Sequence, residues 1–301
     1  MSEAVLLVAL VLAALFTTPV WGDTLKASDP YLVDGVWVWE DIEYGNVDGH
    51  ALLLDAYLPA DREVHPAVIQ IHGGGWRNGS KSSFRASGLD YAKAGVAGFA
   101  IDYRLSDVAT YPAAVDDCLA AIRWIRAHAV DLNVDPDRLG LEGGSAGGHL
   151  VLLMAFMEPG PEDLDADGNR LTNFALCVAA KNPPTDFTAD DTMHSHPAAV
   201  AFMGGPREQE PERHAEASPV THVSPDDPPV FFIHGTADRT VPYNQALVLQ
   251  SRLEEAGIPH ELVTIEGAGH GLSGGDPEQI RQGMARWREF MLAHLLGEGE
   301  G

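Results

Sequence analysis

Short apolar runs alternate with longer amphipathic segments along most of this chain. The apolar runs have the length of strands and predict them at residues 36–43, 51–58, 67–71, 96–102, 138–142, 174–179, 230–234 and 261–265. Between them, the sequence predicts helices at residues 87–94, 113–129, 146–157, 244–256 and 277–296. Strands that alternate with helices predict an α/β fold, a mostly parallel sheet with helices on both faces.

Residues 158–229 interrupt this alternation. The stretch is rich in Pro, Asp, His and Gly, and we interpret it as an irregular insertion or small cap over the carboxyl edge of the sheet. The chain shows no internal repeat and no long linker. We therefore expect residues 23–301 to form a single α/β domain.

The first apolar run covers residues 4–16. It is too short to span a bilayer comfortably but has the length of a signal-peptide core, and Val20 and Gly22 are small residues at the −3 and −1 positions of a cleavage site. The sequence therefore predicts a secretory signal at residues 1–22 and a secreted or periplasmic protein. Glu3 stands where a basic residue is usual, so an uncleaved anchor or a misassigned start remains the alternative.

The amino-acid composition limits the kinds of molecule that we expect this protein to bind. The 301 residues include 44 Asp and Glu against 19 Lys and Arg, a net charge of −25. Phosphate contacts depend on clustered basic side chains, so we expect no nucleic-acid partner and no anionic membrane partner after signal removal. The 45% of hydrophobic residues suffices for a large core. Cys118 and Cys177 fall in different predicted elements, which favours separate buried thiols over a disulfide.

A glycine-rich turn joins the strand predicted at 138–142 to the helix predicted at 146–157. Its residues are Gly143-Gly144-Ser145-Ala146-Gly147, the pattern G-x-S-x-G. In this setting the turn is sharp and lifts the serine hydroxyl above the sheet edge, at the start of a helix that favours negative charge. Ser145 is therefore the candidate nucleophile.

A serine hydroxyl needs a base to take its proton, and an acid to orient that base. In hydrolases with a strand–elbow–helix nucleophile, the acid and then the base follow the serine in sequence. Asp238 and His270 fit this order, because each lies in a loop directly after a predicted strand. The alternatives are His234 or His260 as the base and Glu266 or Asp276 as the acid.

The segment His72-Gly73-Gly74-Gly75-Trp76 follows an earlier predicted strand. Glycines allow backbone N–H groups to converge on one point, as an oxyanion hole requires. We expect Gly74 and Gly75, together with Ala146, to donate those hydrogen bonds. We interpret His72 as a brace for the loop, and Trp76 either as a substrate-binding residue at the mouth of the site or as a packing residue.

These motifs make the sequence resemble the α/β-hydrolase esterases with an HGGG-type oxyanion loop. More narrowly, it resembles the branch of hormone-sensitive-lipase-like carboxylesterases, acetylxylan or feruloyl esterases, and kynurenine formamidase relatives. The resemblance covers nearly all of the chain from about residue 36. It is carried by LDAYLP at 54–59, HGGGW at 72–76, DYRL at 102–105, the stretch from YPA at 111–113 to RWI at 123–125, GGSAGGH at 143–149, HGTADRTVP at 234–242 and GHG at 269–271.

The resemblance implies a serine esterase that needs no cofactor. With a secretory signal and little room for a large cap, it favours acetyl, feruloyl or other short acyl esters, on small molecules or linked to polysaccharide. An amidase, formamidase or peptidase could use the same triad, and a catalytically inactive binding protein is the alternative from another class. We expect the acyl pocket to come from residues 107–111 and 181–229. The sequence carries no signal for an oligomeric state.

An acidic loop stands apart from these motifs. Asp163, Asp165 and Asp167, followed by Gly168, form a D-x-D-x-D-G run that is typical of calcium loops. However, Phe174 occupies the twelfth position, where such loops place a bidentate Glu. The loop is therefore either a calcium site or a solvated acidic surface.

Overall fold

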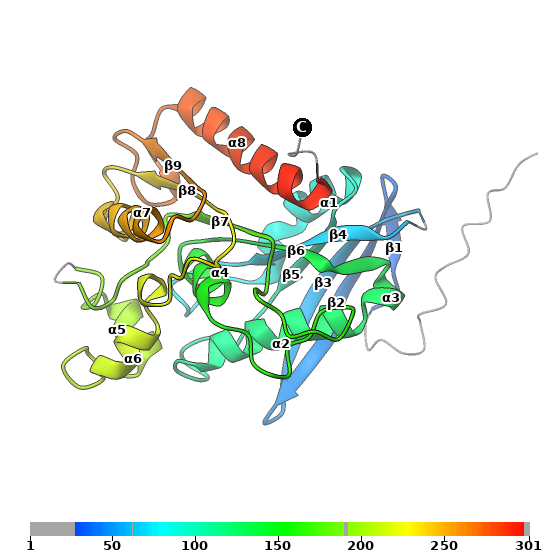
Figure 1. Cartoon of the computed structure of the whole chain (residues 1–301), viewed down its shortest axis with the longest axis horizontal. Helices are drawn as coiled ribbons and strands as arrows, with labels where there is room; N and C mark the ends of the chain where they lie inside the picture. Colours follow the sequence, from blue (N-terminus) through cyan, green and yellow to red (C-terminus); the bar gives the residue numbers. More distant parts are fainter. Residues whose placement is uncertain (1–27, 62, 190–191, 298–301) are drawn as a thin grey trace, which may run out of the picture.

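The computed structural model describes residues 28–61, 63–189 and 192–297. The predicted secretory signal at residues 1–22 lies outside the described residues. One nine-stranded sheet, in the order β1-β2-β3-β5-β4-β6-β7-β8-β9, forms the centre of the molecule (Figure 1). Its strands are β1 (Tyr31–Val33), β2 (Val36–Val47), β3 (His50–Pro59), β4 (His65–Ile71), β5 (Ala97–Ile101), β6 (Val134–Gly144), β7 (Cys177–Lys181), β8 (Val230–Gly235) and β9 (His260–Ile265).

Most of this sheet is parallel, as the sequence predicts. From β5 to β9 in the sheet order, each neighbouring pair is parallel, whereas the pairs β1–β2, β2–β3 and β3–β5 at one edge are antiparallel. Asp48 and Gly49 connect β2 to β3 with φ values of 53° and 85°, the left-handed conformation that a two-residue hairpin turn requires. The parallel strands place their carboxyl ends along one edge, where α/β sheets bind ligands.

Helices cover both faces of the sheet (Figure 1). Apolar residues of α2 (Ala113–Ala127), α4 (Ala146–Phe156) and α7 (Asn244–Ala256) pack into the larger core cluster. On the opposite face, α1 (Arg85–Lys93) and α8 (Pro277–Leu296) pack against a second cluster. Among these helices, α7 and α8 have the predicted bounds. Cys118 belongs to the first cluster and Cys177 to the second, and both are free and buried, which confirms two separate thiols.

The stretch at 158–229 is more ordered than its composition predicts. The strand predicted at 174–179 is present as β7, which lies within the central sheet between β6 and β8, and the unexpected order comes from two short helices. The short helices α5 (Pro197–Met203) and α6 (Pro211–Glu216) both begin with proline, which suits the first position of a helix. Helix α5 places Ala199 and Phe202 in the larger core. The other short elements are α3 (Ala129–Leu132), η1 (Lys81–Phe84), η2 (Pro219–Thr221) and η3 (His270–Leu272).

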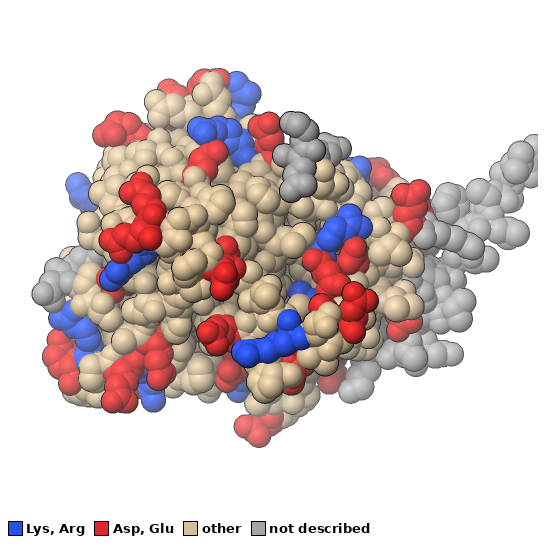
Figure 2. All heavy atoms as spheres, in the orientation of Figure 1, with Lys and Arg blue, Asp and Glu red and all other residues tan. Residues whose placement is uncertain are grey.

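Acidic side chains are spread over the surface. Figure 2 shows Asp and Glu over much of the visible face, with many Lys and Arg side chains beside them. Within the described part of the chain, no helix combines the length and the apolar character needed to cross a membrane.

Candidate active site

Ser145 lies at the turn between β6 and α4. Its φ and ψ are 54° and −121°, a conformation that a non-glycine residue adopts only where its surroundings enforce it. The turn is tight, because a side chain at Gly143 would place its Cβ 2.5 Å from the backbone of Gly147. The Ser145 N–H donates to the Lys181 carbonyl at 2.7 Å. The structure thus forms the strand–turn–helix that the motif predicts.

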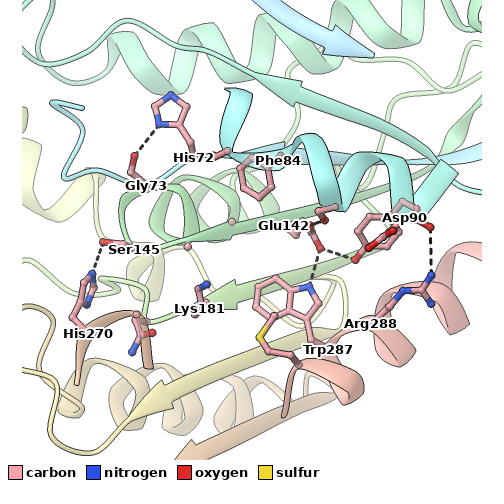
Figure 3. A pocket seen from close by; sticks show the side chains of 18 residues that line it. His72, Gly73, Phe84, Asp90, Glu142, Ser145, Lys181, His270, Trp287 and Arg288 are labelled. Atoms are coloured by element: carbon pink, nitrogen blue, oxygen red, sulfur yellow. Dashed lines mark hydrogen bonds between the residues drawn. The ribbon is translucent and has the colours of Figure 1, made fainter. Parts of the chain in front are cut away.

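His270 and Asp238 come to Ser145 from the loops after β9 and β8. His270 Nε2 lies 2.9 Å from Ser145 Oγ, and its Nδ1 lies 2.7 Å from Asp238 Oδ2 (Figure 3). Residues separated by 125 positions in sequence therefore form one chain of hydrogen bonds. With Nδ1–H donating to the carboxylate, Nε2 is free to accept the serine proton.

The Asp238 carboxylate has further donors that hold its position. The Thr240 and Val241 N–H groups donate to Oδ1 at 2.8 and 2.9 Å, and Asn182 Nδ2 donates to Oδ2 at 3.0 Å. Burial by itself raises the pKa of Asp238. The hydrogen bond with His270 and the backbone N–H donors outweigh that effect and hold its pKa below the usual value. Asp238 therefore stays anionic and can stabilise a protonated imidazole.

Sequence reasoning missed Asn182, which follows β7 directly. Its side chain is buried, and its φ of 47° is one that asparagine tolerates better than most residues. An asparagine at the end of a strand next to the elbow strand was the available signal, but it has no distinctive motif.

The alternative acid and base residues have other partners. His234 is fully buried, and its Nε2 donates to the Val241 carbonyl at 3.0 Å, while His260 Nδ1 contacts the Ile258 carbonyl. Asp276 accepts a hydrogen bond from the Gln279 N–H at the start of α8, and the structure gives Glu266 no place in this network. The structure therefore brings together Ser145, Asp238 and His270.

The glycine loop approaches the elbow directly from β4. A Cβ at Gly73 would lie 3.3 Å from Ser145 Cβ, and Gly74 and Gly75 have φ values of 115° and 61°. His72 Nδ1 donates to the Gly73 carbonyl at 2.8 Å, and its ring stacks on Tyr103 with centroids 4.4 Å apart. Burial lowers the pKa of His72, so its ring is neutral at pH 7. These contacts agree with the bracing role expected of His72.

Trp76 does not line the cavity beside Ser145, contrary to the substrate-binding role that we assigned to it. Its side chain is 2% exposed. The ring stacks on Phe202 at 4.7 Å, and Nε1 donates to His149 Nδ1 at 3.2 Å. Phe202 belongs to α5, a helix that the sequence did not reveal. Trp76 is therefore a core residue, which was the alternative interpretation.

A cavity of about 580 Å³ opens beside Ser145. One end is formed by the elbow and His270, and the walls come from η1, α1 and α8 (Figure 3). Among the described residues of the segments expected to form the acyl pocket, only Lys181 and Asn182 line this cavity. The remaining lining side chains include Ser83, Phe84, Ser87, Asp90, Tyr91, Glu142, Met284, Trp287 and Arg288.

The floor of this cavity contains a buried carboxylate, Glu142, which is 4% exposed. Gln70 Nε2 donates to its Oε1 at 2.7 Å, with Ser87 Oγ more distant at 3.4 Å. Tyr91 OH and Trp287 Nε1 donate to Oε2 at 2.7 and 2.8 Å. Burial, and then the charge of Glu142, raise the pKa of Tyr91. Glu142 thus ties β4, α1 and α8 to the strand that carries Ser145.

We expect Glu142→Gln to lower the free energy of unfolding by about 2 kcal/mol. The new amide must place its NH2 group opposite either Trp287 Nε1, which can only donate, or the Gln70 side-chain amide, and in both cases the remaining hydrogen bonds lose the negative charge that strengthens them. Urea unfolding followed by tryptophan fluorescence measures the effect. Glu254→Gln, on an exposed position of α7, removes the same charge and should change stability little. Equal stability of the two variants would contradict this account.

The acidic loop does not fit a calcium site. Both oxygens of Asp163 are bound by the Arg123 guanidinium, at 2.7 and 2.9 Å. Asp165 accepts hydrogen bonds from the backbone N–H groups of Asp167 and Asn169 within its own turn. Within residues 28–61, 63–189 and 192–297, no group of three or more His, Cys, Asp or Glu residues is arranged to hold a metal ion. The loop is an ion-paired acidic turn, so the calcium interpretation is wrong for Asp163, Asp165 and Asp167.

A serine at a strained strand–helix turn, followed in sequence by an aspartate and a histidine at later strand ends, defines the α/β-hydrolase class. The chain belongs to the BD-FAE family within that class, because the family's model matches residues 54–253. The resemblance inferred from the motifs is therefore confirmed at the level of the family.

Solved structures agree with the fold. An esterase from the planctomycete Thermogutta terrifontis, solved with propionate bound, is 31% identical, covers 86% of this chain and 94% of its own, and superposes with a TM-score of 0.69. A truncated carbohydrate esterase from gut microbiota is 26% identical, covers 87% of this chain and 99% of its own, and has the same TM-score.

LipM of Mycobacterium tuberculosis, named as a carboxylic ester hydrolase, is 33% identical over 78% of this chain. The chain spans only 57% of the length of LipM, and 53% of the length of the esterase LipQ from the same organism. It thus matches about half of each of these two relatives.

Proposed function

We propose that this protein is a serine hydrolase that cleaves carboxylic esters. The observation that carries the proposal is the hydrogen-bonded series Ser145 Oγ, His270 and Asp238, with contacts of 2.9 and 2.7 Å. Its membership of the BD-FAE family and the esterases among its structural neighbours support ester bonds as the target. Neither the family match nor the geometry favours an amide.

The proposed reaction proceeds through an acyl-enzyme. Ser145 Oγ attacks the ester carbonyl carbon while its proton passes to His270 Nε2. The backbone N–H groups of Gly74, Gly75 and Ala146 stabilise the oxyanion, and Asp238 stabilises the imidazolium. The C–O bond then breaks and His270 protonates the leaving alkoxide. Water attacks the acyl carbon in a second cycle, gives its proton to His270, and Ser145 leaves with that proton.

We propose short acyl groups, including acetyl and feruloyl esters on carbohydrate, as the substrate class. The propionate-bound and butyrate-bound forms of the Thermogutta esterase and the carbohydrate esterase of gut microbiota support this choice. The export proposed for residues 1–22 rests on the apolar run at residues 4–16 and would place the enzyme where such esters are found.

The proposal is tested by labelling and by a substrate panel. Paraoxon should inactivate the protein and add one diethyl phosphoryl group to the peptide that contains Ser145, detected by mass spectrometry, because the paired imidazole activates this hydroxyl. Acetyl and butyryl p-nitrophenyl esters, acetylated xylan and methyl ferulate are compared with N-formylkynurenine. Label on another residue would contradict the nucleophile, and faster cleavage of N-formylkynurenine than of every ester would favour the formamidase alternative.

A further inference from the structure

A lysine stands beside the elbow, and the reaction proposed above gives it no role. Lys181 ends β7, next to the strand that carries Ser145, and its carbonyl accepts the Ser145 N–H. Its side chain crosses Gly144, where an added Cβ would lie 3.3 Å from Lys181 Cε. Figure 3 shows this side chain inside the cavity, between those of His270 and Trp287. Because Gly144 has no side chain, the aliphatic part of Lys181 can pass over it and reach the cavity.

The charge of Lys181 has no counter-ion in the described part of the chain. Lys81 pairs with Asp41 and Asp55, and Lys93 pairs with Asp34, whereas no ion pair joins Lys181 to a described carboxylate. This is unusual in a chain of net charge −25, where carboxylates outnumber cations more than two to one.

Of the other charged side chains that line the cavity, Glu142 already accepts hydrogen bonds, and Asp90 and Arg288 lie further from Ser145. Glu142 accepts its hydrogen bonds from neutral donors on the cavity floor. Asp90 and Arg288 lie together at the far end, where Arg288 donates to the Asp90 carbonyl (Figure 3). The end of the cavity beside Ser145 therefore carries a single positive charge that is open to a ligand.

We propose that Lys181 selects esters that carry a carboxylate close to the ester bond, in the acyl or the alcohol part. The inference rests on the proposed ester hydrolysis and names the substrate class of that same site. A charge-assisted hydrogen bond from the ammonium group to a substrate carboxylate is about twice as strong as a neutral one. In a cavity walled by Phe84, Met284 and Trp287, solvent screens that contact less than it would at the surface.

The test compares charged and neutral esters of matched shape. Monoethyl adipate against ethyl hexanoate places the carboxylate in the acyl part, and 3-acetoxybenzoate against phenyl acetate places it in the alcohol part. For the wild-type protein, we expect kcat/KM to favour the charged ester in one pair. Lys181→Met keeps the length of the stem and should lower that charged-to-neutral ratio about tenfold. Lys181→Arg should retain the preference.

Lys93→Met is the matched control, because it removes the same charge from the ion pair with Asp34 and should leave the ratio unchanged. Each variant is judged by the ratio of kcat/KM between two substrates. Partial unfolding lowers both values by the same factor and therefore leaves this ratio unchanged. Hydrolysis of the neutral esters without preference for either charged ester, or an undiminished preference in Lys181→Met, would overturn the inference alone. Failure to cleave any ester would overturn the proposed function and this inference with it.

Discussion

Replacing Ser145 by alanine is expected to lower kcat for the preferred ester by about 10⁴ to 10⁶-fold, because Ser145 supplies the hydroxyl that hydrogen-bonds His270 Nε2 among the described residues. His270 Nε2 would keep its orientation through Asp238 but would have no nucleophile to deprotonate at 2.9 Å. Residual hydrolysis would come from water activated by His270 and from the oxyanion donors. Single-turnover and steady-state assays with p-nitrophenyl acetate measure the loss against the uncatalysed rate.

The same substitution should leave the fold intact. The Ser145 hydroxyl contacts His270, and we expect the melting temperature to change by no more than a few degrees, because about 1 kcal/mol shifts a chain of this size by roughly 2 to 4 °C. Ser251→Ala, on an exposed position of α7, is the matched control and should retain full activity. If a folded Ser145→Ala protein kept a tenth of the wild-type kcat, Ser145 would not be the nucleophile.

The sequence predicts those parts of the structure that are determined by a short continuous segment of the chain. Helices α7 and α8 carry enough turns for their periodicity to define their bounds, and G-x-S-x-G between a strand and a helix predicts the elbow without reference to distant residues. The positions of His270 and Asp238 followed from the ends of parallel strands, which meet at one edge of the sheet.

The parts that it does not predict depend on contacts between distant segments. Glu142 and Trp287 are 145 residues apart in sequence, and no sequence motif predicts that these two residues are in contact. Trp76 is buried because the seven-residue helix α5 supplies Phe202 to cover it, and so short a helix has too few turns to show a period. The cavity walls likewise combine side chains from α1 and α8, which are far apart in sequence. The sequence therefore does not show that these side chains belong to one site.

Gly147→Ala is expected to cost about 2 to 3 kcal/mol of stability and to impair catalysis as well. A Cβ at Gly147 would overlap the carbonyl oxygen of Ile71 and would lie 2.8 Å from the backbone carbon of His72. These are backbone atoms at the point where β4 leads into the glycine loop, so no rotamer change relieves the overlap. Either the elbow or the loop must shift, and a shift of either separates Ser145 from the proposed oxyanion donors.

Gly148→Ala is the matched control, one position further along the same helix. Its Cβ would meet the Gly143 carbonyl oxygen and Pro183 Cβ at 3.3 Å, a tight contact that small movements relieve. Alanine also favours the helix by about 1 kcal/mol over glycine, so this variant should stay within about 1 kcal/mol of wild type. Urea unfolding and ester hydrolysis are measured on both proteins. If Gly148→Ala lost as much stability and activity as Gly147→Ala, close approach of the elbow to β4 would not explain the glycine at 147.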